Sequence, residues 1–374
     1  MSKSFMSKSK VYYSCLRTGF GVSLPQKLQK LIRAAGIGEL PLQDNYAAVK
    51  IHFGEPGNLA FLRPAYAAAV VEVLKEYGAK PFLTDCNTLY VGGRKNALDH
   101  LESAYKNGFT PYSVGCQILI ADGLKGTDEV DLPVPNGEYC KTALIGRAVS
   151  DADVIITLNH FKAHELTGIG GAIKNAGMGC GSRAGKKVMH CDGITKVNAT
   201  LCIGCGRCVQ VCAHDAPVIK NKKAAIDPEK CVGCGRCIGV CPKDAIAPVW
   251  GQAMGMCDRK MTEYAAAVLA GKPQFHISLV IDVSPYCDCH AENDVAIVPN
   301  IGMFASADPV ALDQACADAV NAAPVIKGSV LDEKKKEGVD HFTSIFPETN
   351  WQIQLEHGEK IGLGSRDYEL ITIK

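Results

Sequence analysis

Two copies of one cysteine pattern constrain this chain more than any other feature. Each copy reads C-x2-C-x2-C-x3-C, and the second begins 29 residues after the first. Three thiolates on one tight loop can hold three corners of an iron–sulfur cube, and the fourth ligand then comes from the other copy. The pattern therefore predicts two [4Fe-4S] clusters. The predicted ligands are Cys202, Cys205, Cys208 and Cys241 for cluster I, and Cys231, Cys234, Cys237 and Cys212 for cluster II.

Zinc and disulfides explain this pattern less well. Zinc also binds paired C-x2-C motifs, but four ligands per site leave the third cysteine of each run unexplained. Disulfides between such close cysteines would be strained. The double run resembles that of bacterial two-cluster ferredoxins, where Pro242 is typical and Ala213 is a departure. The resemblance implies a small α+β ferredoxin module, which we place at residues 196–249.

Composition excludes several classes of function. The 374 residues suffice for two or three compact units, and 47% hydrophobic with 21% charged residues is ordinary for a globular protein. A net charge of +1 gives no electrostatic reason to expect nucleic acid as a partner. The apolar runs are too short to span a membrane, and the amino terminus lacks the apolar core of a signal peptide. With eighteen cysteines, we expect a protein of the reducing cytoplasm, without membrane insertion.

Outside the module, strands alternate with helices along the chain. We predict strands at residues 46–53, 81–84, 117–121, 154–158, 275–283, 294–298, 351–355 and 368–373. We predict helices at residues 64–77, 96–107, 142–149, 261–270 and 309–320. Such alternation favours an α/β fold with a mostly parallel sheet and flanking helices. The expected order is a disordered tail (1–10), an α/β domain (11–195), the inserted ferredoxin module (196–249) and the completion of the α/β fold (250–374).

Polar residues follow four of the predicted strands. They are His52, Asp85, Asp122 and the pair Asn159-His160. In open parallel sheets, ligands bind outside the carboxyl ends of the strands. Each residue alone is ordinary at a strand end, but four together predict a shared cleft.

Residues 160–192 carry the densest group of candidate site residues. Seven glycines are interleaved with lysine and arginine, which predicts a loop that could hold an anionic cofactor or another small anion. The catalytic candidates are His164, Glu165, Lys174 and His190, and the cofactor-binding candidates are Gly168, Gly170, Gly171, Lys174 and Asn175. The alternative is a flexible lid with surface lysines.

A second cysteine motif, Cys287-Asp288-Cys289-His290, follows a predicted strand. Thiolates and an imidazole this close can bind one metal ion, so Cys287, Cys289 and His290 are candidate ligands of an additional metal. The alternative is a loop with reduced thiols.

The motifs resemble those of a family of uncharacterised iron–sulfur-centre proteins built on domain of unknown function 362. The resemblance rests on His164-Glu-x-Thr-Gly-x-Gly-Gly-Ala-Ile-Lys174-Asn, the following Gly-Lys-Lys-x-Met-His190, the double cysteine run and Cys287-Asp-Cys289. It implies the α/β fold with a ferredoxin insertion and the two clusters, but no reaction.

A fainter resemblance concerns lactate racemase. His164, Gly170-Gly171, Lys174 and His190 follow one another as in that family. There they imply an acid/base histidine, a lysine that tethers a nickel-pincer nucleotide, and a nickel-binding histidine. Ala172-Ile173 between the glycines and the lysine departs from the motif, and the racemase has no ferredoxin insertion.

Three functions compete on this reading. The first is a ferredoxin-linked oxidoreductase, with electrons exchanged with a redox partner protein or a low-potential donor. The second is an electron carrier or redox-sensing binding protein without catalysis. The third is a metal- or cofactor-handling or lactate-racemase-like enzyme. Because His190 lies twelve residues before Cys202, the linker spans at most roughly 40 Å, so the module is tethered near the candidate site.

Overall fold

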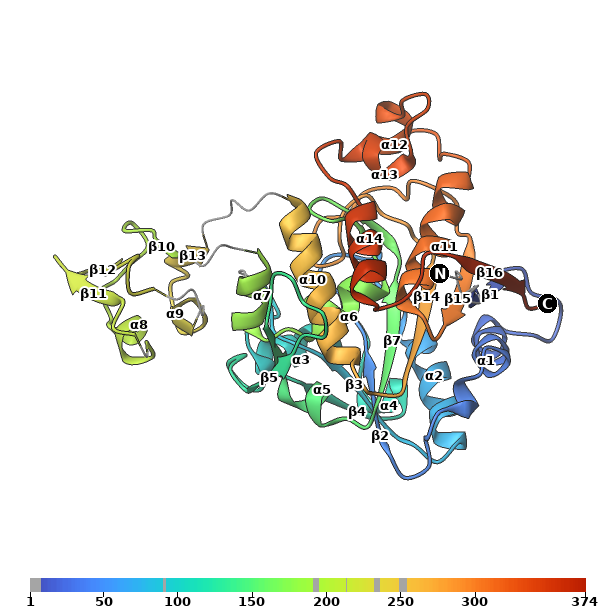
Figure 1. The fold of residues 1–374 in the computed structure, drawn as a ribbon, viewed down its shortest axis with the longest axis horizontal. Helices are drawn as coiled ribbons and strands as arrows, with labels where there is room; N and C mark the ends of the chain where they lie inside the picture. The colour runs from blue at the N-terminus through green and yellow to red at the C-terminus, as the bar shows by residue number, and fades with distance from the viewer. Residues whose placement is uncertain (1–7, 90–91, 191–194, 213, 232–235, 249–253) are drawn as a thin grey trace, which may run out of the picture.

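An eight-stranded sheet organises the computed structural model, which describes residues 8–374 except 90–91, 191–194, 213, 232–235 and 249–253 (Figure 1). In spatial order its strands are β16 (Tyr368–Thr372), β1 (Ser9–Cys15), β15 (Gly302–Ser306), β14 (Gln274–Val280), β7 (Val154–His160), β2 (Tyr46–Lys50), β3 (Lys80–Asp85) and β4 (Gln117–Ile120). Only β15 runs against its neighbours. The predicted α/β fold with a mostly parallel sheet is confirmed.

Helices cover both faces of the sheet and divide the core into two layers. One face carries α1 (Leu24–Ala34), α2 (Pro64–Glu76), α3 (Ala97–Lys106) and α4 (Pro111–Val114). The other carries α6 (Ala172–Cys180), α7 (Arg183–His190), α10 (Met254–Leu269), α11 (Pro309–Ala322) and α14 (Gln352–Ile361). Alternate residues of each strand enter opposite layers, as Ile155 and Ile156 of β7 do, because strand side chains alternate between the faces. Among the described residues, no helix combines the length and apolar character needed to cross a bilayer.

Three predicted elements were wrong. Thr142–Gly146 form strand β6, paired with β5 (Glu129–Pro133), and a helix, α5, covers only Arg147–Asp151. Ala143 and Ile145 are both buried, so the alternating pattern of a strand outweighs the helix propensity of alanine and leucine.

The predicted strand at residues 351–355 is instead the start of α14. Its buried Leu355, Gly358 and Ile361 recur at helical spacing. Over residues 351–355 alone, glutamine alternates with isoleucine and leucine, and this short alternation favoured a strand. Residues 294–298 form no strand; the Ile297 N–H donates to the carbonyl of Val283. Strand β1 begins at Ser9, inside the segment expected to be a tail, whose residues 1–7 lie outside the described residues.

We call residues 195–248 the cysteine-rich segment. It contains two antiparallel pairs, β10 (Thr195–Val197) with β13 (Ile246–Pro248) and β11 (Pro217–Lys220) with β12 (Lys223–Ile226). Two short helices, α8 (Arg207–Gln210) and α9 (Arg236–Gly239), contact each other. The segment lies at one end of the molecule, beside α7 (Figure 1). Its small core is separate from the two layers around the sheet.

Candidate functional site

Parallel strands bring their polar ends together at one edge of the sheet, as predicted. A cavity of about 70 Å³ there is lined by His52 after β2, Asp85 at the end of β3, and Asn159 and His160 at the end of β7. Three of the four predicted strand ends therefore share a cleft. The fourth does not line this cavity, because Asp122 accepts hydrogen bonds from the backbone and side-chain amides of Asn87.

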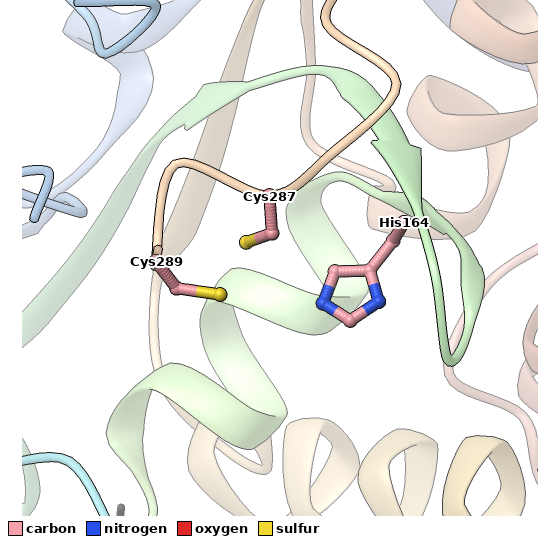
Figure 2. A group of neighbouring side chains, drawn as sticks. All are labelled: His164, Cys287 and Cys289. Carbon is pink, nitrogen blue, oxygen red and sulfur yellow. The ribbon is translucent and has the colours of Figure 1, made fainter. Parts of the chain in front are cut away.

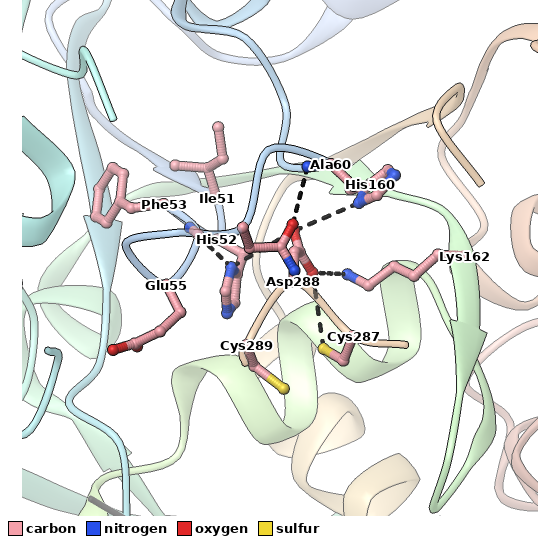
Figure 3. Close-up of polar contacts among 12 residues, drawn as sticks. Ile51, His52, Phe53, Glu55, Ala60, His160, Lys162, Cys287, Asp288 and Cys289 are labelled. Atoms are coloured by element: carbon pink, nitrogen blue, oxygen red, sulfur yellow. Dashed lines mark hydrogen bonds and ion pairs between the residues drawn. The ribbon is translucent and has the colours of Figure 1, made fainter. Parts of the chain in front are cut away.

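A buried carboxylate, Asp288, connects several of these groups (Figure 3). One of its oxygens lies 2.6 Å from Lys162 Nζ, and the other lies 3.4 Å from His160 Nδ1 and 3.6 Å from His52 Nδ1. Burial alone would raise the pKa of Asp288, but Lys162 and the two histidines hold it well below its usual range. Asp288 is therefore an ionised counter-ion for Lys162.

Arg94, although 2% exposed, joins this network from the loop after β3. Its Nε donates to Glu55 Oε2 over 2.8 Å, and its Nη2 donates to the carbonyl of Cys289 over 2.9 Å. Its Nη1 lies 2.8 Å from Nε2 of His52. Burial lowers the pKa of His52 to about 3, so this histidine is neutral at pH 7. Because Arg94 donates to the carbonyl of Cys289, it also fixes the backbone of the second cysteine motif.

The second cysteine motif contributes a pair of adjacent thiols (Figure 2). The sulfur atoms of Cys287 and Cys289 and a ring nitrogen of His164 all lie within 4.8 Å of one another. A second group with the same limit is formed by Glu165, Cys289 and His290. Both groups are compatible with metal binding, since they combine thiolate, imidazole and carboxylate ligands.

Charges around these thiols favour a thiolate. Lys174 Nζ donates to Cys287 Sγ over 3.5 Å. Burial would raise the pKa of Cys287, but a hydrogen bond from Cys289 and the charges of Lys174 and Lys162 hold it well below its usual range. The pKa of Cys289 is raised, chiefly because its thiol is the donor in that hydrogen bond. These surroundings favour loss of a proton from Cys287 before Cys289.

The backbone fixes the protonation of His164. The N–H groups of Leu166 and Thr167 donate to its Nδ1 over 3.0 and 3.3 Å. A nitrogen that accepts hydrogen bonds carries no proton, so the neutral ring is protonated at Nε2. Figure 2 shows the Nε2 edge of the ring turned toward the two sulfur atoms.

A larger pocket, of about 480 Å³, adjoins the first. Its lining includes the catalytic candidates His164, Glu165, Lys174 and His190, together with Cys289 and His290. The fold therefore brings these residues together, although their catalytic roles stay predictions. Burial, reinforced by the nearby Lys174, lowers the pKa of His190 to about 3. At the rim His290 Nε2 lies 2.9 Å from Glu165 Oε1.

The glycine-rich segment is not the open loop that we predicted. Most of it is helical, in α6 and α7. The first N–H groups of α6, at Ala172 and Ile173, donate to the buried carboxylate of Asp313 over 2.7 and 2.9 Å. A Cβ at Gly171 would lie 2.2 Å from this carboxylate, which explains the glycine there. Burial raises the pKa of Asp313 to about 7.

The cofactor-binding candidates separate into two groups. Gly170, Gly171, Lys174 and Asn175 line the smaller cavity. Asn175 also accepts a hydrogen bond from Lys50 Nζ over 2.6 Å. Gly168 instead packs against Trp351. A Cβ added at Gly168 would lie 2.7 Å from Cβ of Trp351.

In the cysteine-rich segment, Cys202, Cys205, Cys208 and Cys241 line one cavity. Cys202 Sγ accepts the N–H groups of Gly204 and Ala224 over 3.4 and 3.3 Å, and Cys241 Sγ accepts that of Ala245 over 3.2 Å. These hydrogen bonds lower the pKa of the Cys202 thiol. Of the other predicted ligands, Cys212, Cys231 and Cys237 are described and Cys234 lies outside the described residues.

Helix α7 links the cysteine-rich segment to the pocket. Lys187 Nζ donates to Thr195 Oγ1 over 3.5 Å, and Thr195 Oγ1 lies 3.3 Å from Cys231 Sγ. The preceding residue of α7, Lys186, lines both pockets at the sheet edge. A second link is the ion pair between Lys95 and Asp244.

Several residues of the site were missed at the level of sequence. Lys50 is buried at the end of β2, and Arg94 lies in a segment without a motif. Lys162 lies inside residues 160–192 but is not among the candidates named there. A buried lysine leaves one readable signal, a charge inside an otherwise apolar strand, which Lys50 shows between Val49 and Ile51. Asp288 lies within the predicted Cys-x-Cys motif, but its partners come from other strands and no local pattern identifies them.

Two solved structures are similar to this chain. A protein from Thermotoga maritima shares 14% identity at a TM-score of 0.39, over 79% of this chain and 57% of that protein. The lactate racemase apoprotein from Thermoanaerobacterium thermosaccharolyticum shares 12% identity at a TM-score of 0.32, over 73% of this chain and 51% of the racemase. This chain thus spans little more than half the length of either. A search of curated proteins found no match.

One protein family covers most of the chain and agrees with the family that the motifs resemble. Residues 47–318 match Domain of unknown function (DUF362). The matched range runs from β2 through the cysteine-rich segment to α11, so it includes the pocket and both cysteine motifs. The chain belongs to the DUF362 family.

Proposed function

We propose that this protein is an iron–sulfur oxidoreductase, with two [4Fe-4S] clusters in the cysteine-rich segment and a substrate site in the pocket at the sheet edge. On this proposal, residues 196–249 are a ferredoxin module inserted between residues 11–195 and 250–374. The observation that carries it is the cavity lined by Cys202, Cys205, Cys208 and Cys241, the four ligands expected for one cluster.

The surroundings of these cysteines suit a cluster. N–H donors to thiolate sulfur stabilise the negative charge of iron–sulfur centres and tune their potentials. Three such donors reach Cys202 and Cys241. Cys231, a predicted ligand of the second cluster, contacts Thr195. When bound, each cluster would supply one electron at a time, so two clusters match a two-electron reaction.

Side chains of the pocket suit a small anionic substrate. Lys174 and Lys186 line it, and the pKa of Lys174 is raised, because the nearby Cys287 and other anions outweigh its burial. These cations would orient a carboxylate or phosphate group. His164, with its proton on Nε2, would supply a proton to the reacting atom.

This pocket favours an oxidoreductase over a plain electron carrier. A carrier needs only a route for electrons and a docking surface. Here Lys50, Lys162 and Asp288 are buried beside the pocket. Burying such charges costs free energy, and charged groups of this kind cluster at functional sites.

Iron analysis of protein purified without oxygen tests the clusters. We expect about eight iron atoms per chain and loss of about half of them in Cys202→Ser. Cys140→Ser, which removes a buried thiol of the α/β part, is the matched control and should keep all the iron. Zinc in place of iron, or equal iron in both variants, would contradict the proposal.

Reoxidation of the reduced protein tests the substrate site. After anaerobic reduction, small carboxylates and phosphorylated compounds are added singly while cluster absorbance is followed. A substrate should restore the oxidised spectrum in the wild type and in Lys30→Gln, a change at a surface lysine. Lys174→Gln should keep its iron but lose this response at least about tenfold, because the anion loses its counter-charge. An equal response in both variants would disprove the assignment of Lys174.

A further inference from the structure

Backbone contacts fix the two thiols of the Cys287-Asp288-Cys289 turn side by side. The Glu55 N–H donates to the carbonyl of Asp288 over 2.9 Å, and Arg94 donates to that of Cys289. The His290 N–H donates to the carbonyl of Cys287 over 3.1 Å. Their sulfurs lie within 4.8 Å of each other. A disulfide between cysteines this close in the chain is strained and therefore easily reduced, as a reversible pair requires.

The hydrogen bonds of His164 disfavour this histidine as a metal ligand at the two sulfurs. A histidine that binds metal through Nε2 normally carries a proton on Nδ1 and donates it to an acceptor. Nδ1 of His164 instead accepts two backbone N–H groups.

Two polar groups suit a reactive thiol pair instead. Lys174 supplies a positive charge 3.5 Å from Cys287 Sγ. His164 directs its Nε2 edge toward both sulfurs (Figure 2). A cation and a proton donor beside adjacent thiols are the features that make a dithiol exchange with a disulfide.

Access also differs between the two cysteines. Cys287 is fully buried, whereas Cys289 is 7% exposed and lines both pockets. Cys289 can therefore react with a molecule in the larger pocket. Cys287 does not reach that pocket but can form the disulfide with Cys289.

We propose that Cys287 and Cys289 form a redox-active dithiol–disulfide pair, the two-electron acceptor between one-electron centres and the substrate pocket. Two electrons from a low-potential one-electron donor break the S–S bond. One proton then goes to Cys289, which becomes a thiol, and Cys287 becomes a thiolate paired with Lys174. In the oxidising direction the pair loses two electrons and the Cys289 proton, and the S–S bond forms again. The identity of the donor rests on the proposed function, but the pair itself does not.

Equilibration in glutathione buffers tests the pair. The intact protein is held without oxygen across a series of reduced-to-oxidised glutathione ratios, and exchange is stopped with acid. The protein is then unfolded, its free thiols are alkylated with excess reagent at pH 7, where thiolate forms, and the mass of the peptide containing Cys287 and Cys289 is measured. We expect a reversible change between two alkylated thiols and one internal disulfide. The buried Cys316, on α11, should remain a free thiol and be alkylated at every ratio, so it serves as the internal control.

Variants separate the pair from its surroundings. Cys289→Ser should abolish the reversible change, whereas Cys316→Ser should leave it intact. Lys174→Gln should shift the balance at least about tenfold toward the disulfide, because the Cys287 thiolate loses its counter-charge. Two thiols that stay reduced at every ratio would overturn the proposal. So would tightly bound zinc that must be chelated before either thiol is alkylated.

A second arm distinguishes this proposal from the proposed function. Dithionite is added to the disulfide form of the wild type and of Cys202→Ser, which is expected to hold about half of the iron, and the fraction of disulfide in the peptide is followed in time. Slower reduction, by about tenfold or more, in Cys202→Ser supports electron delivery through the cysteine-rich segment. Wild-type protein that holds no iron when purified without oxygen, yet forms the disulfide reversibly, would uphold the pair and refute the proposed clusters.

Discussion

The two cysteine-containing regions of this protein are built in opposite ways. In the cysteine-rich segment, potential ligands come from short loops, and backbone N–H groups of the same segment surround the sulfurs. At the sheet edge, Cys287 and Cys289 are surrounded by charged side chains from β7, β8 (Lys162–His164) and α6. The first region depends on local sequence, and the second depends on the whole sheet. Their stability should therefore respond to different changes.

Metal removal should affect the two regions most unequally. The core of the cysteine-rich segment is small, and small domains built around metal ligands rarely stay folded without the metal. After chelation, we expect limited proteolysis to cut this segment at least about tenfold faster, since the open form becomes populated. The α/β part should resist cleavage as before, and equal cleavage of both parts would remove the contrast.

Neutralising Asp288 should destabilise the sheet-edge region strongly. In Asp288→Asn the buried Lys162 loses its counter-ion, and breaking a buried ion pair costs about 3 kcal/mol or more. Urea denaturation at pH 7 would measure this loss in the free energy of unfolding. The control Asp282→Asn removes a more exposed carboxylate paired with Arg63 and should cost less than about 1 kcal/mol. A loss this small in Asp288→Asn would show that the site tolerates an unpaired lysine.

A methyl group added between α6 and α10 should destabilise the packing of α6, the helix that carries Lys174. In Gly177→Ala the new Cβ would lie 2.0 Å from the carbonyl oxygen of Met261, so the helices must separate. Overpacking of this kind costs about 2 kcal/mol, measurable by thermal or urea unfolding. Gly19→Ala, where nothing lies within 4 Å of the added atom, should change stability by less than about 0.5 kcal/mol. The cluster absorbance expected under the proposed function should be the same in both variants.

The smallest expected effect is a shift in the titration of His290. The hydrogen bond to Glu165 raises the pKa of His290 above 6.5. Burial would raise the pKa of Glu165, but His164 and His290 lower it to about 2. Stability from the protonated His290 is thus complete below pH 6.5 and is lost as the pH rises through its folded pKa. That from ionised Glu165 is present above its unfolded pKa and is lost as the pH falls toward 2.

Proton NMR of the histidine ring should therefore show a midpoint above 6.5 in the wild type and a lower one in Glu165→Gln. Glu348→Gln, in an exposed loop, is the control and should leave the midpoint in place. Identical midpoints in all three proteins would separate His290 from Glu165 in solution.

Most of the α/β pattern could be predicted from sequence because long apolar strands and capped helices are local features. Helix α11 begins at Pro309, where the helix was predicted to begin, and the side chain of Asp308 caps it. The errors at residues 142–149 and 351–355 arose where a few residues fit either period and packing decided between them. The candidate histidines and Lys174 could be named in advance, but Arg94, Lys50 and Lys162 could not.

The sequence by itself determined the α/β class, the family and the cysteine spacing, because each of these is written in residues that are close together in the chain. Only the tertiary structure decided that Asp313 occupies the start of α6, that Asp288 is paired with Lys162, and that His164 presents Nε2 to two thiols. These contacts join residues more than a hundred positions apart. Burial makes the charges of Lys162 and Asp288 costly unless they are paired, and the pairing depends on the packed interior, which no short motif encodes.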